Sequence, residues 1–270
     1  MSQDTMIQDI KAHVAKLLED GTIAGFVGLI EQNGHVAPHL FTSGEKLSGF
    51  SLGDFNSPGD SRYPLNKTLT TIARAYPHQT FGVLVRGCDE RGLFGLFRLN
   101  QLRENRVVAV GLSCPDALAG ACECKKPYPD ALVAGEKTQV PALKQVAQMD
   151  GKDLAQRFDF WRDQFLKCVK CYGCRDICPM CFCNECSLEC EDLIKKGDLP
   201  VEVPVFHLTR AMHMADRCVD CGLCDEACPS DIPLRLLYKK TAEIMNVEFG
   251  FTSGLNKKEK SPLSTMGPSK

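Results

Sequence analysis

The segment CVKCYGCRDICP, residues 168–179, decides how this chain folds, and a second copy, CVDCGLCDEACP, follows at residues 218–229. In each copy three cysteines stand at intervals of three residues, and a fourth comes four residues later and is followed by proline. The chain has 16 cysteines in 270 residues, several times the usual share for a protein of this size. Four lie in the first 150 residues and twelve between residues 168 and 228. The cysteines therefore have to be explained first.

Each copy has the C-x2-C-x2-C-x3-C-P spacing of the bacterial ferredoxin signature for a [4Fe–4S] cluster. The first three thiolates of a copy bind one cubane, and the fourth, turned away before the proline, binds the other. The spacing thus predicts two clusters, one held by Cys168, Cys171, Cys174 and Cys228, and the other by Cys218, Cys221, Cys224 and Cys178. Zinc also takes four thiolates, but it needs neither the doubled pattern nor the prolines.

Three cations lie close to the motifs, namely Arg210, Arg217 and Lys170. They are expected to offset the negative charge of the clusters, or else to form salt bridges on a solvated face. The histidines, including His207 and His213 before the second motif, are expected to be structural.

Eight cysteines lie outside the two motifs. They are Cys88, Cys114, Cys122, Cys124, Cys181, Cys183, Cys186 and Cys190. A third metal site with ligands from both halves of the chain is expected, and the proposed set is Cys122, Cys124, Cys183 and Cys186. This pairing of C-x-C with C-x2-C suits an iron–sulfur cluster or zinc. Further candidates are Cys114, Cys181 and Cys190, whereas Cys88 is expected to be a small buried residue at a strand end.

Composition and charge exclude several classes of function. Lys and Arg number 32 against 34 for Asp and Glu, so the summed charge gives no general attraction to nucleic acid or to an anionic membrane. The start, MSQDTMIQDIKAHVAKLLEDG, lacks the apolar core of a secretory signal, and no apolar run is long enough to span a bilayer. We expect a cytoplasmic protein that is either soluble or bound to a membrane only through partners, in a compartment that keeps thiols free to bind metal.

The first part of the chain alternates short apolar runs with helical patterns. Strands are expected near residues 23–30, 81–86 and 107–112, and helices near 5–19, 65–75 and 92–102. This order predicts a small parallel α/β layer. The Gly- and Ser-rich stretch 42–64 is expected to be a loop, of a length that invites a functional explanation.

After residue 140 the pattern becomes helical. Helices are expected at 141–148, from 153 into the first motif, at 205–216 and at 233–245. The predicted fold is an α/β N-terminal domain, residues 1–150, followed by a mainly α-helical ferredoxin-type domain with two [4Fe–4S] clusters, residues 151–248. Residues 249–270 are expected to be disordered or ordered by a partner.

The cysteine-rich half resembles a known family of electron carriers. The 39 residues between the two motifs include a predicted helix, and the run RCVDCGLCDEACPSDIPLRLL at 217–237 is especially similar to the α-helical ferredoxins. These occur in the ferredoxin-like C subunit of heterodisulfide reductase and in the iron–sulfur subunits of succinate dehydrogenase. The resemblance covers roughly residues 150–245.

The stretch FGVLVRGCDERGLFGLFRLNQLRENRVVAVGLSCP, residues 81–115, resembles the core of the beta subunits of deazaflavin-reducing hydrogenases and formate dehydrogenases. In those subunits the ferredoxin segment precedes the α/β domain, whereas here it follows. The chain is also shorter than the flavin-bearing members, so FAD is an alternative and not the expectation. Residues 86–91 follow a strand, where they can contact a flavin or partner or simply cap the next helix.

The function expected from these features is single-electron transfer. The chain has no catalytic motif, so the resemblances imply an iron–sulfur subunit that passes electrons between a flavin or cluster donor and a catalytic subunit. The partners implied are flavoprotein and catalytic subunits of a hydrogenase, a formate dehydrogenase or a heterodisulfide-reductase-like complex. One alternative is an FAD-dependent oxidoreductase that exchanges hydride with a deazaflavin or nicotinamide. Another is a redox sensor or scaffold whose clusters serve mainly folding.

Overall fold

The computed structural model describes residues 1–59, 61–141, 144–195 and 205–264. The chain divides into two compact units, unit 1 (Met1–Ala142) and unit 2 (Leu143–Lys270), and each is described by itself. The division falls earlier than the boundary expected at residue 150, because helix α5 (Lys144–Asp150) packs against α10 (Leu234–Phe249) of unit 2. Unit 1 contains the α/β sheet, and unit 2 is helical with most of the cysteines.

Unit 1 is built on a six-stranded sheet in the order β2-β1-β4-β5-β6, with β3 paired to β1. The strands are β1 (Gly25–Gln32), β2 (His35–Phe41), β3 (Phe50–Ser51), β4 (Phe81–Val85), β5 (Val107–Leu112) and β6 (Leu132–Ala134). Strands β1, β4, β5 and β6 run parallel, as expected for the main layer. Strands β2 and β3 pair antiparallel with β1, so the sheet is mixed.

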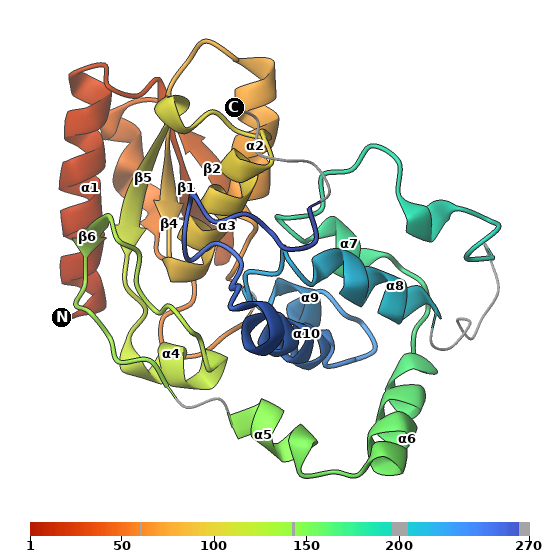
Figure 1. The fold of residues 1–270 in the computed structure, drawn as a ribbon. Helices are drawn as coiled ribbons and strands as arrows, with labels where there is room; N and C mark the ends of the chain where they lie inside the picture. The colour runs from red at the N-terminus through yellow and green to blue at the C-terminus, as the bar shows by residue number, and fades with distance from the viewer. Residues whose placement is uncertain (60, 142–143, 196–204, 265–270) are drawn as a thin grey trace. The chain divides into compact units, whose positions relative to one another are not determined.

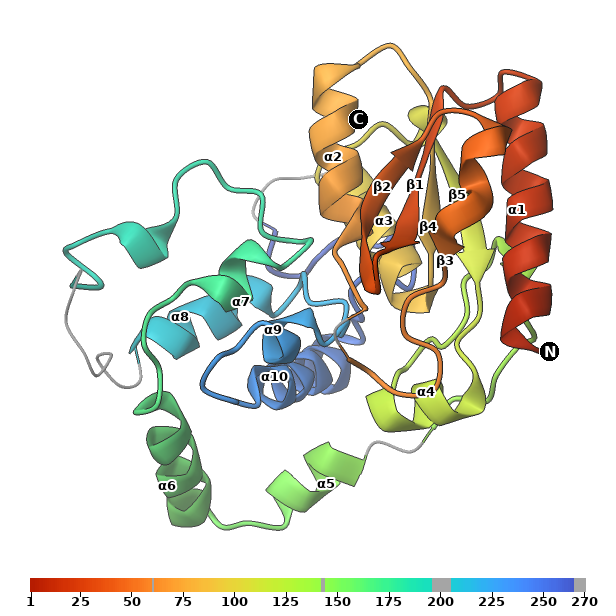
Figure 2. The same cartoon turned by 180° about the vertical axis from the view of Figure 1, so that it is seen from behind.

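Helices cover both faces of this sheet, with α1 (Gln3–Glu19) on one side and α2 (Leu65–Ala75) and α3 (Gly87–Arg98) on the other (Figures 1 and 2). Helix α1 buries Met6, Ile10 and Val14, whose spacing of four residues forms one apolar stripe. Strand β4 is buried along its whole length. A strand covered on both faces is apolar throughout, which explains the run FGVLV.

The carboxyl edge of the parallel strands is where the chain turns into its next helices. Helix α3 begins at Gly87, earlier than the expected residue 92, because the Asp89 carboxylate accepts the backbone N–H of Arg86 at 3.0 Å. After β5, helix α4 (Asp116–Cys122) follows within four residues. The stretch 42–64 contains the 3-10 helix η1 (Gly44–Gly49) as well as β3, and η2 (Glu104–Arg106) precedes β5.

Unit 2 consists of helices joined by the cysteine loops. They are α5, α6 (Leu154–Phe165), α7 (Gly173–Asp176), η3 (Ser187–Glu189), α8 (Val205–Met214), α9 (Leu223–Glu226) and α10. The short helices α7 and α9 each lie inside one motif and pack side by side (Figure 1).

The first residues after α10 are packed structure and not a free tail. Phe251 is buried in one apolar cluster with Ala215 and Met245, all within unit 2. The end of the expected tail, residues 265–270, lies outside the described residues. In the part of the chain that the structure describes, no helix is long and apolar enough to cross a membrane.

Candidate metal centres

The two motif loops of unit 2 share one backbone conformation. Lys170 and Tyr172 in the first loop have positive φ angles of 49° and 59°, and Asp220 and Gly222 at the matching positions of the second have 57° and 82°. Two left-handed residues per loop curve the chain tightly, which brings the three neighbouring cysteines of a loop around one space.

The first loop closes around a cavity with about 320 Å³ of empty space. Four cysteines line it: Cys168, Cys171, Cys174 and Cys228. Three of these belong to the first motif, and the last belongs to the second. The remaining wall is largely apolar and includes Phe206 and Ile232, which are each 1% exposed.

The second loop closes around a cavity with about 370 Å³ of empty space. It is lined by the other four motif cysteines, Cys178, Cys218, Cys221 and Cys224. Here the single contribution from the first motif is Cys178, which stands before Pro179. The structure thus brings the eight predicted ligands together in two sets of four, with the fourth member of each set exchanged between the motifs.

Backbone N–H groups point at cysteine sulfurs in both loops. The N–H of Gly173 donates to Cys171 Sγ at 3.4 Å, and the N–H of Asp220 donates to Cys218 Sγ at 3.4 Å. In the second motif Ile232 also donates to Cys228 Sγ at 3.5 Å. Such bonds favour the thiolate over the thiol, and they tune the potential of a cluster that the sulfur binds.

Arg210 of α8 is one of the three cations that the sequence predicted near these cysteines. Its guanidinium is buried, donates to Cys181 Sγ at 3.2 Å and to the Cys174 carbonyl at 2.7 Å, and lines the second cavity. It also lies over the Tyr238 ring, 5.6 Å from the centroid. A buried guanidinium offsets negative charge that develops on neighbouring sulfurs.

The other two predicted cations, Lys170 and Arg217, make contacts of a different kind. The Lys170 ammonium donates to the Lys195 carbonyl at 2.7 Å. The Arg217 guanidinium lies 5.7 Å from the centroid of the Phe182 ring, which is a cation–π contact. Both residues flank the motifs, and the charge of Lys170 also lowers the pKa of Cys168, against the larger opposing effect of burial.

Burial makes the metal-free thiols of both cavities weak acids. It raises the pKa of Cys174 to about 11 and that of Cys224 well above its ordinary value. The same effect lowers the pKa of His207, which lines the first cavity, to about 4. The neutral His207 ring stacks on Phe165 with centroids 4.5 Å apart, so it acts as part of the apolar wall, as the sequence indicated.

A buried ion-pair network attaches the second loop to α10. Arg235 Nε lies 2.6 Å from the Asp220 carboxylate, and its Nη2 donates to the Asp220 carbonyl at 2.8 Å. The backbone N–H of Arg235 donates to Asp225 at 2.7 Å. The left-handed turn of the second loop is therefore held by side chains of the following helix.

None of the four cysteines that follow the first motif is buried, whereas Cys174, Cys178 and Cys224 of the motifs are. Cys183 and Cys190 are exposed. Cys186 packs partly against the cluster of Leu188, Ile194 and Phe206. A hydrogen bond with Cys181 is the largest effect that raises the pKa of Cys178. The predicted pair Cys183 and Cys186 lies in unit 2, whereas Cys122 and Cys124 lie in unit 1.

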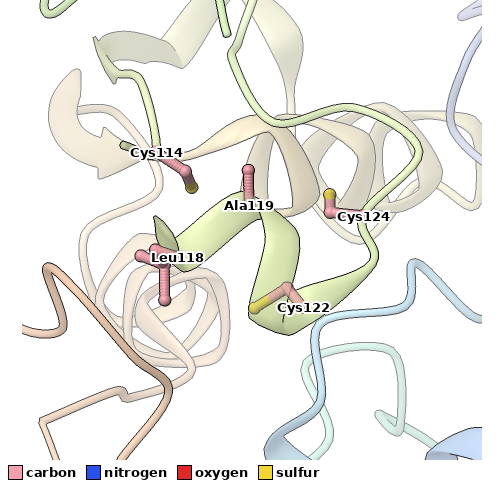
Figure 3. Close-up of a cluster of buried hydrophobic side chains, with 5 residues drawn as sticks. All are labelled: Cys114, Leu118, Ala119, Cys122 and Cys124. Atoms are coloured by element: carbon pink, nitrogen blue, oxygen red, sulfur yellow. The ribbon is translucent and has the colours of Figure 1, made fainter. Parts of the chain in front are cut away.

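All four cysteines of unit 1 are buried, each between 6% and 8% exposed. Figure 3 shows three of them around α4: Cys114 after β5, Cys122 at the end of the helix, and Cys124 just beyond it. Cys88 lies close to this group, because the Arg62 guanidinium contacts both Cys88 Sγ and Cys122 Sγ. Within the described residues, no three His, Cys, Asp or Glu side chains close around a single metal ion.

Two arginines donate to these sulfurs, and the sequence pointed to neither as a cysteine partner. Arg62 Nη2 lies 3.7 Å from Cys88 Sγ and its Nη1 lies 3.8 Å from Cys122 Sγ. Arg86 Nη1 lies 3.5 Å from Cys114 Sγ. The only signal for Arg62 was its place in the unusually long stretch 42–64.

Two curated proteins resemble half of this chain. They are the F420-dependent formate dehydrogenase subunit beta of Methanocaldococcus jannaschii and the F420-dependent formate dehydrogenase 1 subunit beta of Methanococcus maripaludis. Each is 34% identical over 140 residues, which is 51% of this chain but 37% and 36% of the two relatives. No protein-family model matches the chain.

The chain therefore spans little more than a third of the length of the relatives it matches. The predicted resemblance to beta subunits is confirmed for formate dehydrogenases. Half of this chain is similar to the beta subunits of F420-dependent formate dehydrogenases.

Proposed function

We propose that the protein is an iron–sulfur electron-transfer subunit of a multisubunit oxidoreductase, with two [4Fe–4S] clusters in unit 2. One observation carries this proposal: each of two cavities in unit 2 is lined by three cysteines of one motif and the last cysteine of the other. That is the ligand exchange that the C-x2-C-x2-C-x3-C-P spacing requires of a two-cluster ferredoxin. The donor set of four thiolates per cavity fits the group.

The residues around the cavities would perform three tasks. The cysteines would lose their protons to bind iron, after which each bound cluster supplies one-electron redox chemistry. The amides of Gly173, Asp220 and Ile232 would stabilise the negative sulfurs. Arg210 would offset the added charge of reduction, and the apolar wall would keep water away and so set the potential.

The names of the relatives suggest the surrounding complex. Because half of the chain is similar to beta subunits of F420-dependent formate dehydrogenases, we propose that it accepts or delivers electrons within a formate-dehydrogenase-like assembly. The sequence also resembles subunits of hydrogenases and of heterodisulfide reductase, so complexes of these two kinds are the alternative partners. Anaerobic copurification of a tagged full-length chain from its native cell identifies the partner directly.

The cluster assignment is tested on the full chain purified under anaerobic conditions. We expect iron and acid-labile sulfide in equal amounts, with an electron paramagnetic resonance signal of two interacting reduced clusters after dithionite. Cys171→Ser and Cys221→Ser, one per cavity, should each remove or alter one cluster. Cys190→Ser is the matched control on an exposed cysteine. Zinc or unmodified thiols at the motif cysteines would disprove the function.

A flavin in unit 1 is a second candidate, favoured by the F420-dependent activity in the names of the relatives. FAD at the carboxyl edge of the sheet would exchange hydride with a deazaflavin, and the clusters would carry the electrons away singly. A stoichiometric flavin absorbance that bleaches when reduced deazaflavin is added supports this candidate. Clusters that reduce in the absence of any bound flavin oppose it.

A further inference from the structure

Each cavity of unit 2 has in its wall a polar aromatic side chain that is almost fully buried. His207 of α8 lines the first cavity, and Tyr238 of α10 lines the second. Each residue is 1% exposed, and the two helices pack against each other. Neither residue belongs to a cysteine motif. The wall of each cavity therefore includes a buried polar group that is not one of the predicted metal ligands.

The polar atoms of these two side chains have no protein partner. Both ring nitrogens of His207 and the hydroxyl of Tyr238 are buried and make no hydrogen bond within the described part of the chain. Asn66 and Arg210 each have one buried atom of this kind as well, but each donates through another atom of its side chain. A polar group that loses its hydrogen bonds to water and gains none destabilises the fold. Because such groups are rare in folded proteins, a partner inside the cavity is indicated for both side chains.

Both side chains are hydrogen-bond donors at neutral pH. Burial raises the pKa of the Tyr238 hydroxyl well above its ordinary value, against the opposing effect of Arg210. Burial, and to a lesser extent the charge of Arg210, lowers the pKa of His207 to about 4. The hydroxyl therefore keeps its proton, and the neutral imidazole has one N–H donor and one acceptor nitrogen.

Packing against the ring faces holds both donors in place. The His207 ring stacks on Phe165, with centroids 4.5 Å apart and an angle of 19° between the planes, and it meets Phe206 edge to face at 5.0 Å. The Arg210 guanidinium lies over the Tyr238 ring, 5.6 Å from the centroid. Such contacts fix the plane of a ring, whereas the nitrogens and the hydroxyl lie on the ring edges.

Sulfur is the acceptor that each cavity supplies. Four cysteines line each cavity, and charge on Cys224, Cys174 and Cys178 acts on the Tyr238 hydroxyl. An ionised acceptor forms a stronger hydrogen bond than a neutral one. The sulfur atoms of an iron–sulfur cluster become more negative on reduction, so a neighbouring donor stabilises the reduced state and raises the potential.

We propose that His207 and Tyr238 donate hydrogen bonds to the sulfur atoms of the two clusters, His207 in the first cavity and Tyr238 in the second, and thereby raise the two midpoint potentials. These roles depend on the proposed function, because they require both clusters. Each cavity gains a neutral donor, in addition to the positive charge that Arg210 brings to the second. Helices α8 and α10, which contain no cysteine, thus take part in setting the potentials.

Tyr238→Phe removes one hydroxyl and keeps the buried ring. In the full chain we expect unchanged iron content and one midpoint potential lowered by about 40 mV, which is about fivefold in the equilibrium constant of reduction. A dye-mediated redox titration followed by electron paramagnetic resonance measures both potentials. Tyr76→Phe is the matched control at a tyrosine of unit 1 that is 53% exposed, and it should move neither potential.

His207→Phe keeps an aromatic ring against Phe165 but has no donor. We expect it to lower mainly the other of the two potentials by a similar amount, while His207→Gln, which retains an N–H group, lowers it less. His213→Phe at an exposed position of the same helix is the control and should move neither potential. The proposal is overturned if His207→Phe and Tyr238→Phe lower the same potential, or if either of them leaves both potentials unchanged.

The unmodified chain gives a further measurement that misfolding of a variant does not affect. Pulsed electron paramagnetic resonance of the reduced chain, labelled with ¹⁵N-histidine, should show a weak ¹⁵N coupling to a cluster, and His207→Phe should abolish it. A labelled chain without this coupling would overturn the role of His207. The proposed function fails in a different way, when the unmodified chain binds no iron or when Cys171→Ser and Cys221→Ser leave its iron content unchanged.

Discussion

Arg210 is the residue that links the two cavities of unit 2. Its guanidinium lines the cavity of Cys218, Cys221 and Cys224, and it also donates to the carbonyl of Cys174 in the other cavity. A fixed positive charge in a site of low dielectric stabilises a more negative, reduced cluster. The residue therefore influences both cysteine sets.

Arg210→Met should lower the midpoint potential of at least one cluster by about 60 mV, which is tenfold in the equilibrium constant of a one-electron couple. The reason is that the reduced state loses a hydrogen bond and a neighbouring cation. A dye-mediated redox titration followed by electron paramagnetic resonance measures the shift. Arg162→Met, on an exposed face of α6, is the control and should leave the potentials unchanged. Equal potentials in both variants would contradict this role for Arg210.

At the scale of elements, the two motif loops share one backbone conformation, but different side-chain contacts stabilise it in each loop. Tyr172 occupies the second left-handed position of the first loop, and its hydroxyl donates to the Leu188 carbonyl at 2.9 Å. Gly222 occupies the matching position of the second loop, against the Arg235 side chain. Packing compensates the strain at Tyr172, while glycine avoids it in the other loop.

Gly222→Ala should destabilise unit 2 by about 1 kcal/mol, because alanine is strained at a φ of 82°. Chemical unfolding of the cluster-loaded chain measures the change. Gly151→Ala in the same unit meets only ordinary contacts and needs no positive φ, so it should be neutral or slightly stabilising. Equal losses in the two variants would show that the left-handed conformation at Gly222 is not the cause.

Arg235→Met should destabilise the second loop by about 3 kcal/mol, because it leaves the buried Asp220 carboxylate without its closest cation. The free energy of unfolding and the rate of cluster loss under chelator both report this change. Arg162→Met breaks exposed ion pairs with Asp159 and Asp163, and such pairs contribute little. A stable Arg235→Met variant would show that α10 does not anchor the loop.

The whole molecule consists of two units, and a different kind of interaction stabilises each of them. Unit 1 has a sheet covered by helices on both faces, with β4 buried throughout and the second half of the neighbouring β5 buried beside it. Unit 2 has short helices connected by cysteine loops, so we expect its stability to depend on the clusters proposed for those loops.

Cys171→Ser combined with Cys221→Ser should therefore open unit 2 selectively. We expect faster hydrogen exchange in α7, α8, α9 and α10, and unchanged protection in β4 and β5, because the core of unit 1 does not use these cysteines. Exchange measured by mass spectrometry under anaerobic conditions reports both units in one sample. Loss of protection in the sheet as well would mean that the two units fold as one.

Spacing along the chain was enough to identify the two motifs, to place helix 65–75 and strand 107–112 at their observed bounds, and to indicate the two halves. These features are local, since a ligand set or an apolar stripe repeats within a few residues. Spacing also pointed to Arg210, Arg217 and Lys170 as cations near the motifs, and of these Arg210 donates to a cysteine sulfur, that of Cys181.

Other features depended on contacts between distant residues. Strand β2 could be recognised only from its pairing with β1. The first residue of α3 could be assigned only from the hydrogen bond between the Arg86 N–H and the Asp89 carboxylate. The group of Cys88 with Cys114, Cys122 and Cys124, and the arrival of Arg62 from the long loop, exist only because parallel strands end at the same edge of a sheet. The spacing of these residues along the sequence does not reveal that they share this edge, because the helices and loops between them differ in length.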